Sequence, residues 1–195
     1  MSETNTITPN VPRKNDRTLV VLDFENIYIG LKKYNKKWIT SLNDWLDTTY
    51  KPVEKVAFLD VQRVNGQRAL LTSDGWTIND VLTSGKKENP EDRTIFLKNA
   101  VDMSLALFTM DYAYRHNINK LVLLSGDGDY AELVKYLKRK GIEVTAVCTY
   151  ESISKRLFHV VNDTQYLELI LNLLEEPKEP ASEITIEQAS SAGVL

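Results

Sequence analysis

The stretch Leu121-Val-Leu-Leu-Ser-Gly-Asp-Gly-Asp-Tyr130 decides the fold. It begins as a continuous apolar run and breaks into a segment of Gly, Ser and Asp. The apolar residues that follow have helical spacing: Leu133, Val134 and Leu137. This pattern predicts a buried strand, a tight turn and a helix. Open α/β sheets bind ligands at the carboxyl ends of their strands, so Asp127 and Asp129 are the first candidate functional residues.

Structural roles could also explain these two aspartates. Asp129 followed by Glu132 has the spacing of a helix capping box, and Asp127 between two glycines is ordinary turn chemistry. Taken alone, Asp129 fits the capping role better. A phosphate-binding loop fits less well, because the stretch lacks the Lys of a P-loop and two negative charges would repel a phosphate unless a cation lay between them.

The length and composition of the chain predict one folded domain. The chain has 195 residues, of which 43% are hydrophobic, and this suits a single well-packed core. No apolar run approaches the roughly 20 residues of a membrane-spanning helix, and the N-terminus lacks the pattern of a signal peptide. The single cysteine, Cys148, excludes an intramolecular disulfide and a cysteine-ligated zinc site. We expect a soluble, cytoplasmic protein in which Cys148 is a core residue.

The net charge of −3 is unevenly distributed along the chain. Residues 175–195 hold five Glu and one Lys, a net charge of −4, whereas residues 1–17 carry +1. We expect residues 1–17 to be a disordered leader, 18–174 to be the folded domain and 175–195 to be an acidic disordered tail. A neutral domain that contains an acidic pocket carries basic surface elsewhere, and such a surface can follow a phosphate backbone.

A second apolar run, Thr18–Asp23, also ends in a carboxylate. Glu25 and Asn26 follow it, and because they are adjacent we expect only one of them to point into a site with Asp23. Further strands are expected at 53–61, 76–82 and 143–148, and helices follow the pattern at 24–34, 41–51, 65–71, 95–117 and 152–161. Ser152 is the expected cap of the last of these helices, and 166–174 is expected to be a strand leading into a helix. This alternation predicts a mainly parallel sheet with helices on both faces, and places Asp23 and Asp127 at the same edge.

The longest helical pattern, 95–117, carries an aspartate on its apolar face. Asp102 shares that face with Leu105, where a carboxylate is costly unless it is paired or bound to a metal. An ion pair with Lys98, four residues earlier, is the alternative explanation. Asp111 lies about half a turn round the helix from Asp102, so we expect it at the surface.

Lysines and aromatic rings are candidates for contact with a nucleic acid. They follow the first short helix, occupy the polar loop 84–92 and precede the long helix. The candidates are Lys32, Lys33, Lys36, Lys37, Trp38, Lys86, Lys87 and Lys98. Cations interleaved with rings suit a phosphate backbone and its bases, although a solvated lysine face explains the first four equally well.

In combination, these motifs resemble the NYN domain family, which includes the cyanobacterial LabA-like proteins. The motifs that carry the resemblance are Asp23-Phe-Glu-Asn26, Lys98-Asn-Ala-Val-Asp102, Leu124-Ser-Gly-Asp-Gly-Asp-Tyr130 and Gly141-Ile-Glu-Val-Thr145. The resemblance covers roughly Thr18 to Leu169. It implies a PIN-like, Rossmann-like α/β fold of three layers and a divalent-metal-dependent endoribonuclease that hydrolyses RNA phosphodiester bonds.

The resemblance also implies an acidic pocket. Carried over position by position, the catalytic residues are Asp23, Asn26, Asp102, Asp127 and Asp129, with Ser125 as a supporting loop residue. The four aspartates would bind Mg²⁺ or Mn²⁺, because clustered carboxylates repel and hard oxygen ligands favour these ions. The ion would polarise the scissile phosphate and bring a water close to a base. Many family members have a second acid six residues after the helix aspartate. Here that position is Phe108, so one metal ion rather than two is the simpler expectation.

Two other functions are consistent with the sequence. Asp23 at a strand end could be the nucleophile of a phosphatase, although Glu25 and Asn26 replace the usual partner acid and no Lys clearly follows. The other is an NYN domain with little or no turnover that acts as an RNA-binding or regulatory module, and Phe108 favours it. The expected partner is RNA, with no membrane, and the apolar segment Tyr166–Leu174 is a candidate contact for a homo-oligomer.

Overall fold

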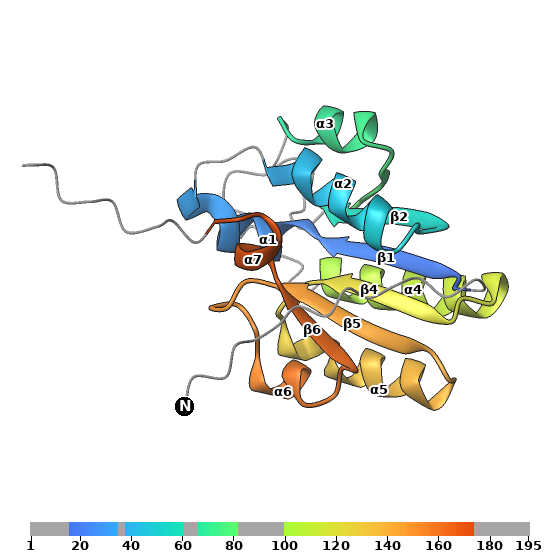
Figure 1. Ribbon diagram of the computed structural model, residues 1–195. Coiled ribbons are helices and arrows are strands. Elements are labelled where there is room, and N and C mark those ends of the chain that lie inside the picture. Colours follow the sequence, from blue (N-terminus) through green and yellow to red (C-terminus); the bar gives the residue numbers. More distant parts are fainter. Residues whose placement is uncertain (1–15, 35–37, 61–65, 82–99, 174–195) are drawn as a thin grey trace, which may run out of the picture.

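A central parallel sheet organises the chain. The computed structural model describes residues 16–34, 38–60, 66–81 and 100–173. In these ranges six strands form one sheet in the order β3-β2-β1-β4-β5-β6, and all neighbouring strands are parallel (Figure 1). The strands are β1 (Thr18–Asp23), β2 (Glu54–Leu59), β3 (Thr77–Asp80), β4 (Lys120–Leu124), β5 (Glu143–Cys148) and β6 (Asp163–Tyr166). The expected α/β fold is confirmed.

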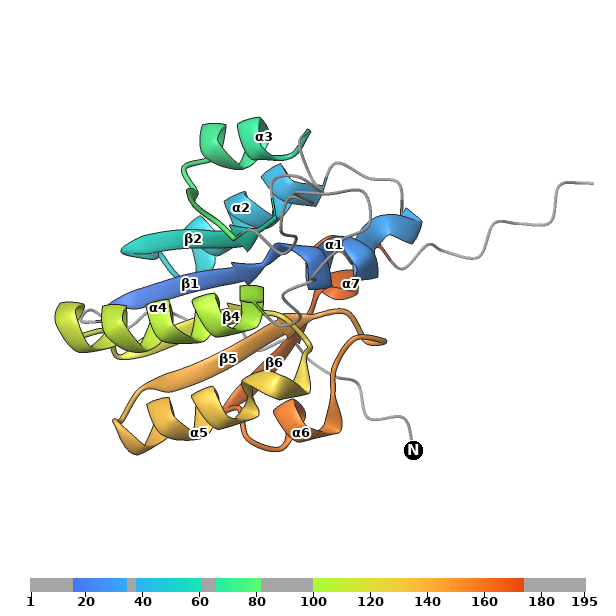
Figure 2. The same ribbon diagram turned by 180° about the vertical axis from the view of Figure 1, so that it is seen from behind.

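Helices cover both faces of this sheet. One face carries α1 (Phe24–Leu31), α2 (Trp38–Thr49), α3 (Arg68–Ser73) and α7 (Leu167–Ile170), with the short 3-10 helix η1 (Lys32–Tyr34) after α1. The opposite face carries α4 (Ala100–His116), α5 (Ala131–Arg139) and α6 (Lys155–Phe158), with the 3-10 turn η2 (Gly128–Tyr130) directly before α5. Figure 2 shows this second face, with α4 and α5 in front of the strands.

Strand β1 lies in the middle of both hydrophobic cores. Val20 and Leu22 pack in the core under α1 and α2, whereas Leu19 and Val21 pack in the core under α4 and α5. A strand covered on both faces reads as a continuous apolar run, which is why β1 and β4 were recognisable in the sequence. The chain leaves β1 for β2 on one side and reaches β4 on the other. Such a reversal of strand order opens a crevice at the carboxyl ends of the strands.

The segment after β5 departs from the sequence prediction. Ser152 does not cap a helix; its Oγ accepts from the Thr149 N–H at 3.1 Å. Ser154 caps α6 instead by accepting from the Arg156 N–H, and α6 is a single short helix that ends at Phe158. The expected strand within 166–174 lies earlier, as β6, and α7 follows it. This edge strand, Asp-Thr-Gln-Tyr, is polar and only partly buried, so it lacks the apolar pattern of the central strands.

Other expectations concern the ends and the core. Cys148 is fully buried, as predicted. Of the expected leader, only Asp16 and Arg17 are described, and the Arg17 N–H donates to Asn119 Oδ1 at 2.9 Å. The tail 175–195, and the part of the long helix expected at 95–99, lie outside the described residues, so the domain limits remain predictions. None of the helices in the described ranges is long and apolar enough to cross a membrane.

Candidate functional site

The carboxyl ends of β1 and β4 bring the first two predicted motifs together. β1 ends at Asp23, and its parallel neighbour β4 ends at Leu124, directly before the Gly-Asp loop. The hydroxyl of Ser125 therefore reaches back to Asp23 Oδ2 and donates to it at 3.3 Å. Asp127 follows two residues later in the same loop. The prediction that Asp23 and Asp127 lie at one edge of the sheet is confirmed.

Asp23 is a buried carboxylate, with 5% of its surface exposed. Its Oδ1 accepts from the Asn26 N–H at 3.2 Å, and the Tyr130 hydroxyl donates to Oδ2 at 3.2 Å. Burial raises the pKa of Asp23 to about 6, the charge of Asp102 adds to the rise, and the hydrogen bonds oppose it. Asp23 therefore changes its charge close to neutral pH.

The Tyr130 hydroxyl connects Asp23 with Asp102. It lies 3.2 Å from Asp23 Oδ2 and 2.9 Å from Asp102 Oδ1. Burial and the two carboxylates together raise the pKa of Tyr130 far above its ordinary value, so the phenol keeps its proton. One hydroxyl proton can serve only one carboxylate at a time. The second contact is favourable only when a proton or a cation offsets the negative charge of the pair.

Tyr130 is a site residue beyond those that the sequence motifs predict. It is 1% exposed and lies directly after the two loop aspartates. The available signal was its spacing, because Leu133 and Val134 follow three and four residues later on the buried face of α5. A tyrosine on that face, beside aspartates at a strand end, buries its hydroxyl where only polar partners can satisfy it.

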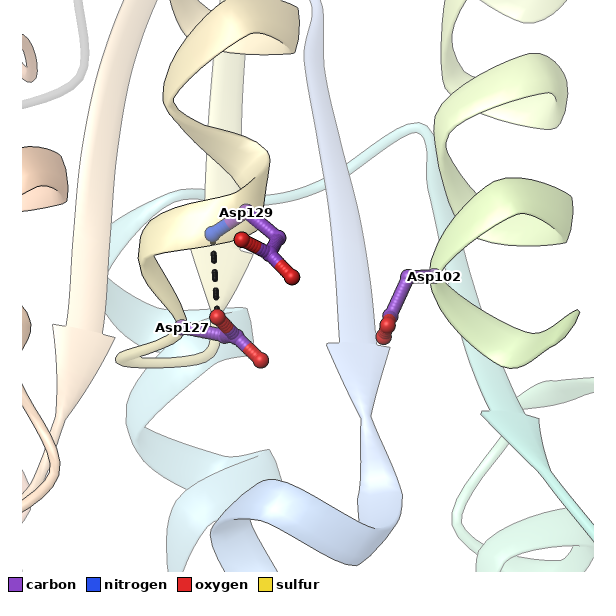
Figure 3. Close-up of side chains that lie close together, drawn as sticks. All are labelled: Asp102, Asp127 and Asp129. Carbon is purple, nitrogen blue, oxygen red and sulfur yellow. Dashed lines mark hydrogen bonds between the residues drawn. The ribbon is translucent and has the colours of Figure 1, made fainter. Parts of the chain in front are cut away.

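Three of the predicted aspartates form a compact group. One carboxylate oxygen each from Asp102, Asp127 and Asp129 lies within 4.8 Å of the others. Asp102 comes from the first turn of α4, and the other two come from the loop before α5, so the three side chains meet above the carboxyl end of β1 (Figure 3). Asp23 does not belong to this group and is linked to it through Tyr130.

The capping interpretation of Asp129 is wrong. It is Asp127 that makes the local turn, because its Oδ1 accepts from the Asp129 N–H at 2.9 Å and its own N–H donates to Ser125 Oγ at 3.1 Å. The helix α5 begins two residues after Asp129, and no side chain caps it. Glu132, the other half of the expected capping box, forms an ion pair with Lys135 at 2.8 Å instead. The Asp129 carboxylate is therefore not used as a helix cap.

Asn26 and Gly126 hold the loop in place. The Gly126 N–H donates to Asn26 Oδ1 at 3.0 Å, and the Gly126 carbonyl accepts from the Ser154 N–H at 2.8 Å. This contact presses the loop against the segment before α6, so that a Cβ on Gly126 would overlap the carbonyl oxygen of Ser152. Asn26 thus contacts the predicted loop as a positioning residue.

Replacing Gly126 with Ala is expected to destabilise the fold by roughly 1–3 kcal/mol, because the new methyl group meets backbone that cannot rotate away. Gly128→Ala is the matched control. Its Cβ would lie 2.5 Å from the Ser154 Oγ, a side-chain atom that can rotate, so the expected loss is only that of the α6 cap, about 0.5–2 kcal/mol. Thermal unfolding of both variants measures the difference. Equal losses would show that the backbone contact at Gly126 is not tight.

Asp102 is half-buried at the start of α4. Burial raises its pKa, and the charges of Asp127 and Asp129 raise it further, while the hydrogen bond from Tyr130 opposes them. Lys98, its alternative ion-pair partner, lies outside the described residues. Asp111 lies at the surface as predicted and forms an ion pair with Arg115 at 2.8 Å.

Arg156 brings a positive charge to the same group. Its Nη1 lies 3.4 Å from Asp129 Oδ1, and both side chains are more than half exposed. An ion pair so open to water contributes little to stability. The guanidinium is therefore free to turn from Asp129 to a phosphate bound beside it.

The chemistry of this group suits a hard divalent cation. All three side chains offer carboxylate oxygens, the ligands that Mg²⁺ and Mn²⁺ prefer. Their mutual repulsion raises the pKa of Asp102, and a cation between them would reverse that effect. Asp102, Asp127 and Asp129 are accordingly the residues that could hold the ion, with Tyr130 and Asp23 behind them.

A comparison with protein-family models identifies the family. The NYN domain model matches residues 17–168, which is most of the chain. The chain belongs to the NYN domain family. This family generally contains ribonucleases. The match starts just before β1 and ends within α7, so it includes every element that carries the aspartate group.

The fold of this chain is similar to that of a solved structure. A protein of unknown function, VPA0982 from Vibrio parahaemolyticus, has a TM-score of 0.60 and 16% sequence identity, covering 79% of this chain and 94% of its own. This likeness concerns the fold alone. MurG from Acinetobacter baumannii gives a TM-score of 0.47 at 10% identity, covering 76% of this chain and 40% of its own, too low to carry an argument. The comparison with curated proteins gives no match.

The residues predicted to contact nucleic acid differ in their exposure to solvent. Lys32 and Lys33 are exposed on η1, and Lys33 forms an ion pair with Glu151 at 2.8 Å. Trp38 is 8% exposed and packs its ring 6.0 Å from that of Phe24, so its ring is not presented to a base, and this prediction is wrong. The remaining candidates lie outside the described residues: Lys36, Lys37, Lys86, Lys87 and Lys98.

Phe108 is part of the packing between α4 and the sheet. Its ring lies edge-on to Phe58 of β2 at 5.5 Å and beside Tyr112 at the same distance. An acid at this position would lose both ring contacts. A further carboxylate nevertheless lies beyond the end of β2, where Asp60 is fully buried. The sequence prediction had placed Asp60 inside a strand and therefore overlooked it.

Proposed function

We propose that the chain is a divalent-metal-dependent endoribonuclease that hydrolyses RNA phosphodiester bonds at the aspartate group. The observation that carries this proposal is the convergence of three carboxylates, from two separate elements, within 4.8 Å at the carboxyl edge of the sheet. Membership of a family that generally contains ribonucleases supports the choice of RNA as substrate. The proposed cofactor is Mg²⁺ or Mn²⁺.

Asp102, Asp127 and Asp129 would hold the ion. When bound, the ion would polarise the scissile phosphate and make a bound water a better nucleophile. Asp127 keeps its carboxylate in position through the Asp129 N–H, so the loop presents two acids in a fixed arrangement. The Tyr130 hydroxyl lies between Asp102 and Asp23 and fixes the position of one carboxyl group relative to the other. Asp23 and Tyr130 are therefore positioning residues in this proposal.

Positive charge near the group would bind the RNA backbone. Arg156 lies beside Asp129 and could contact a phosphate held at the ion. Lys32 and Lys33 are exposed at the end of α1 and are proposed as more distant backbone contacts. Such contacts act through charge, so they would govern affinity and its dependence on salt rather than the chemical step.

The experiment that tests this function is incubation of the purified protein with total cellular RNA, with Mg²⁺, with Mn²⁺ or with a chelator. Sequencing of new RNA ends is expected to show cuts only where a metal is present. RNA binding without cuts under every metal condition would contradict the ribonuclease.

The alternative in that case is an NYN domain that binds RNA or acts as a regulatory module without turnover. Phe108 favours it, since an aromatic ring occupies the position where many family members have a second acid. The phosphatase alternative has less support, because Asp23 is 5% exposed and both its oxygens accept hydrogen bonds. A nucleophilic aspartate must present an oxygen to its substrate.

A further inference from the structure

A groove runs between α4 and α5 on the face shown in Figure 2. Its volume is about 380 Å³. Its walls are mainly apolar: Met103, Ala106, Met110, Leu133 and Tyr136 line it, together with the charged Glu132. Met103 stands at the surface with 65% of its area exposed, so the groove is open to solvent rather than sealed in the core. An open apolar groove on a surface indicates a binding site.

One end of this groove is the aspartate group itself. Asp102, Asp129 and Tyr130 belong both to the group and to the lining of the groove. A ligand with a charged part at the carboxylates and an apolar part beside it would occupy both regions at once. Because the groove is continuous with the aspartate group, we expect its occupant to be a part of the substrate that is bound at the aspartates.

We propose that the groove binds one unpaired base of the RNA, next to the phosphate held at the aspartate group. This inference rests on the proposed ribonuclease function and specifies its substrate as single-stranded RNA. A base has an apolar face that packs on aromatic and thioether side chains, and Tyr136 and the two methionines offer such surfaces. A base within a duplex is paired and stacked, so it cannot enter a groove between two helices.

The lining also predicts how selective the groove is. Its polar side chains are Asp102, Asp129 and Tyr130 at one end, where the phosphate and the metal ion would engage them, and Glu132, which forms an ion pair with Lys135. Few donors and acceptors then remain along the groove to read the edge of a base. Recognition by stacking tolerates different bases, so we expect a preference for single strands with little preference for sequence.

The test uses a single-stranded RNA oligonucleotide that is cut at one site, and a series in which one nucleotide at a time lacks its base. Cleavage is followed under single-turnover conditions, and binding by fluorescence anisotropy before appreciable cleavage. For the wild-type chain, loss of one particular base beside the cut is expected to weaken binding and cleavage by roughly tenfold. The same sequence in a duplex is expected to bind more weakly.

Tyr136→Ala identifies the groove as the place where that base binds. The variant is expected to lose roughly tenfold in affinity for the intact oligonucleotide and to be insensitive to loss of the same base. A merely destabilised variant would still respond to the missing base. Tyr114→Ala is the matched control, because Tyr114 lies on α4 with 87% of its surface exposed and outside the groove.

The outcomes separate this inference from the proposed function. Cleavage that depends on no single base, or equal binding of duplex and single strand, overturns the inference and leaves the ribonuclease intact. Base-dependent binding that Tyr136→Ala removes, without cleavage in any metal, supports the groove and contradicts the ribonuclease. A change of sedimentation mass in Tyr136→Ala with unaltered RNA binding would make the groove a contact between copies of the chain and overturn the inference.

Discussion

Asp102→Asn is expected to lower metal-dependent RNA cleavage by roughly 10³-fold while the chain stays folded. In the wild type the Tyr130 hydroxyl lies 2.9 Å from Asp102 Oδ1, and the Asn side chain keeps an oxygen that can accept from it. The substitution removes the negative charge that would hold the metal ion. The repulsion from Asp127 and Asp129 disappears with that charge. Without metal the variant should therefore melt at the same temperature as the wild type or higher.

The gain in stability from metal separates lost chemistry from lost folding. Binding to the folded state alone stabilises a protein by about 2.7 kcal/mol at a metal concentration of roughly 100 Kd. We expect this gain for the wild type in Mn²⁺ and expect Asp102→Asn to lose most of it. Cleavage assays and thermal melts with Mn²⁺ or chelator measure both effects.

Asp111→Asn is the matched control for this substitution. It makes the same chemical change on the same helix, at an exposed position that pairs with Arg115. Wild-type cleavage and a normal response to Mn²⁺ are expected. If Asp102→Asn also cleaves at the wild-type rate, the aspartate group is not the catalytic site.

The sheet edge was predictable because it follows from chain-local patterns. Buried parallel strands are continuous apolar runs, so the ends of β1 and β4 could be located in the sequence. The rule that such ends lie at one edge then placed Asp23 beside the Gly-Asp loop. Asp102 was predictable for a different reason, since a carboxylate on an apolar helix face needs a partner or a metal.

Other features depend on contacts between distant parts of the chain. The Tyr130 hydroxyl meets residues 107 and 28 positions away, a geometry fixed only by the packing of α4 and α5. Trp38 was a candidate for RNA contact because lysines precede it, yet its ring packs in the core beside Phe24. Spacing alone also could not show that Asp127, rather than Asp129, makes the local turn. For each of these residues, its contacts depend on burial and side-chain direction, which residue spacing does not specify.

Asp23→Asn is expected to stabilise the metal-free chain at pH 7 by up to about 3 kcal/mol, since burial raises the pKa of Asp23 from 3.8 to about 6 and each unit corresponds to about 1.4 kcal/mol. Between these two pKa values the folded chain keeps a proton that the unfolded chain has lost. The folded state thus binds more protons, and the free energy of unfolding of the wild type falls as the pH rises from about 4 to about 6. Asn carries no such charge and keeps an oxygen that can accept from the Asn26 N–H.

Urea unfolding in chelator across this pH range measures the difference between wild type and Asp23→Asn, so that other titrating groups cancel. The difference should be small near pH 4, grow through pH 6 and then stay constant. A difference that does not change with pH would mean that Asp23 has an ordinary pKa in the folded chain. The expected result would identify a carboxylate that lowers the stability of its own fold. Packing cannot explain why a fold keeps such a group, whereas a role in positioning Tyr130 and Asp102 at a metal-dependent site can.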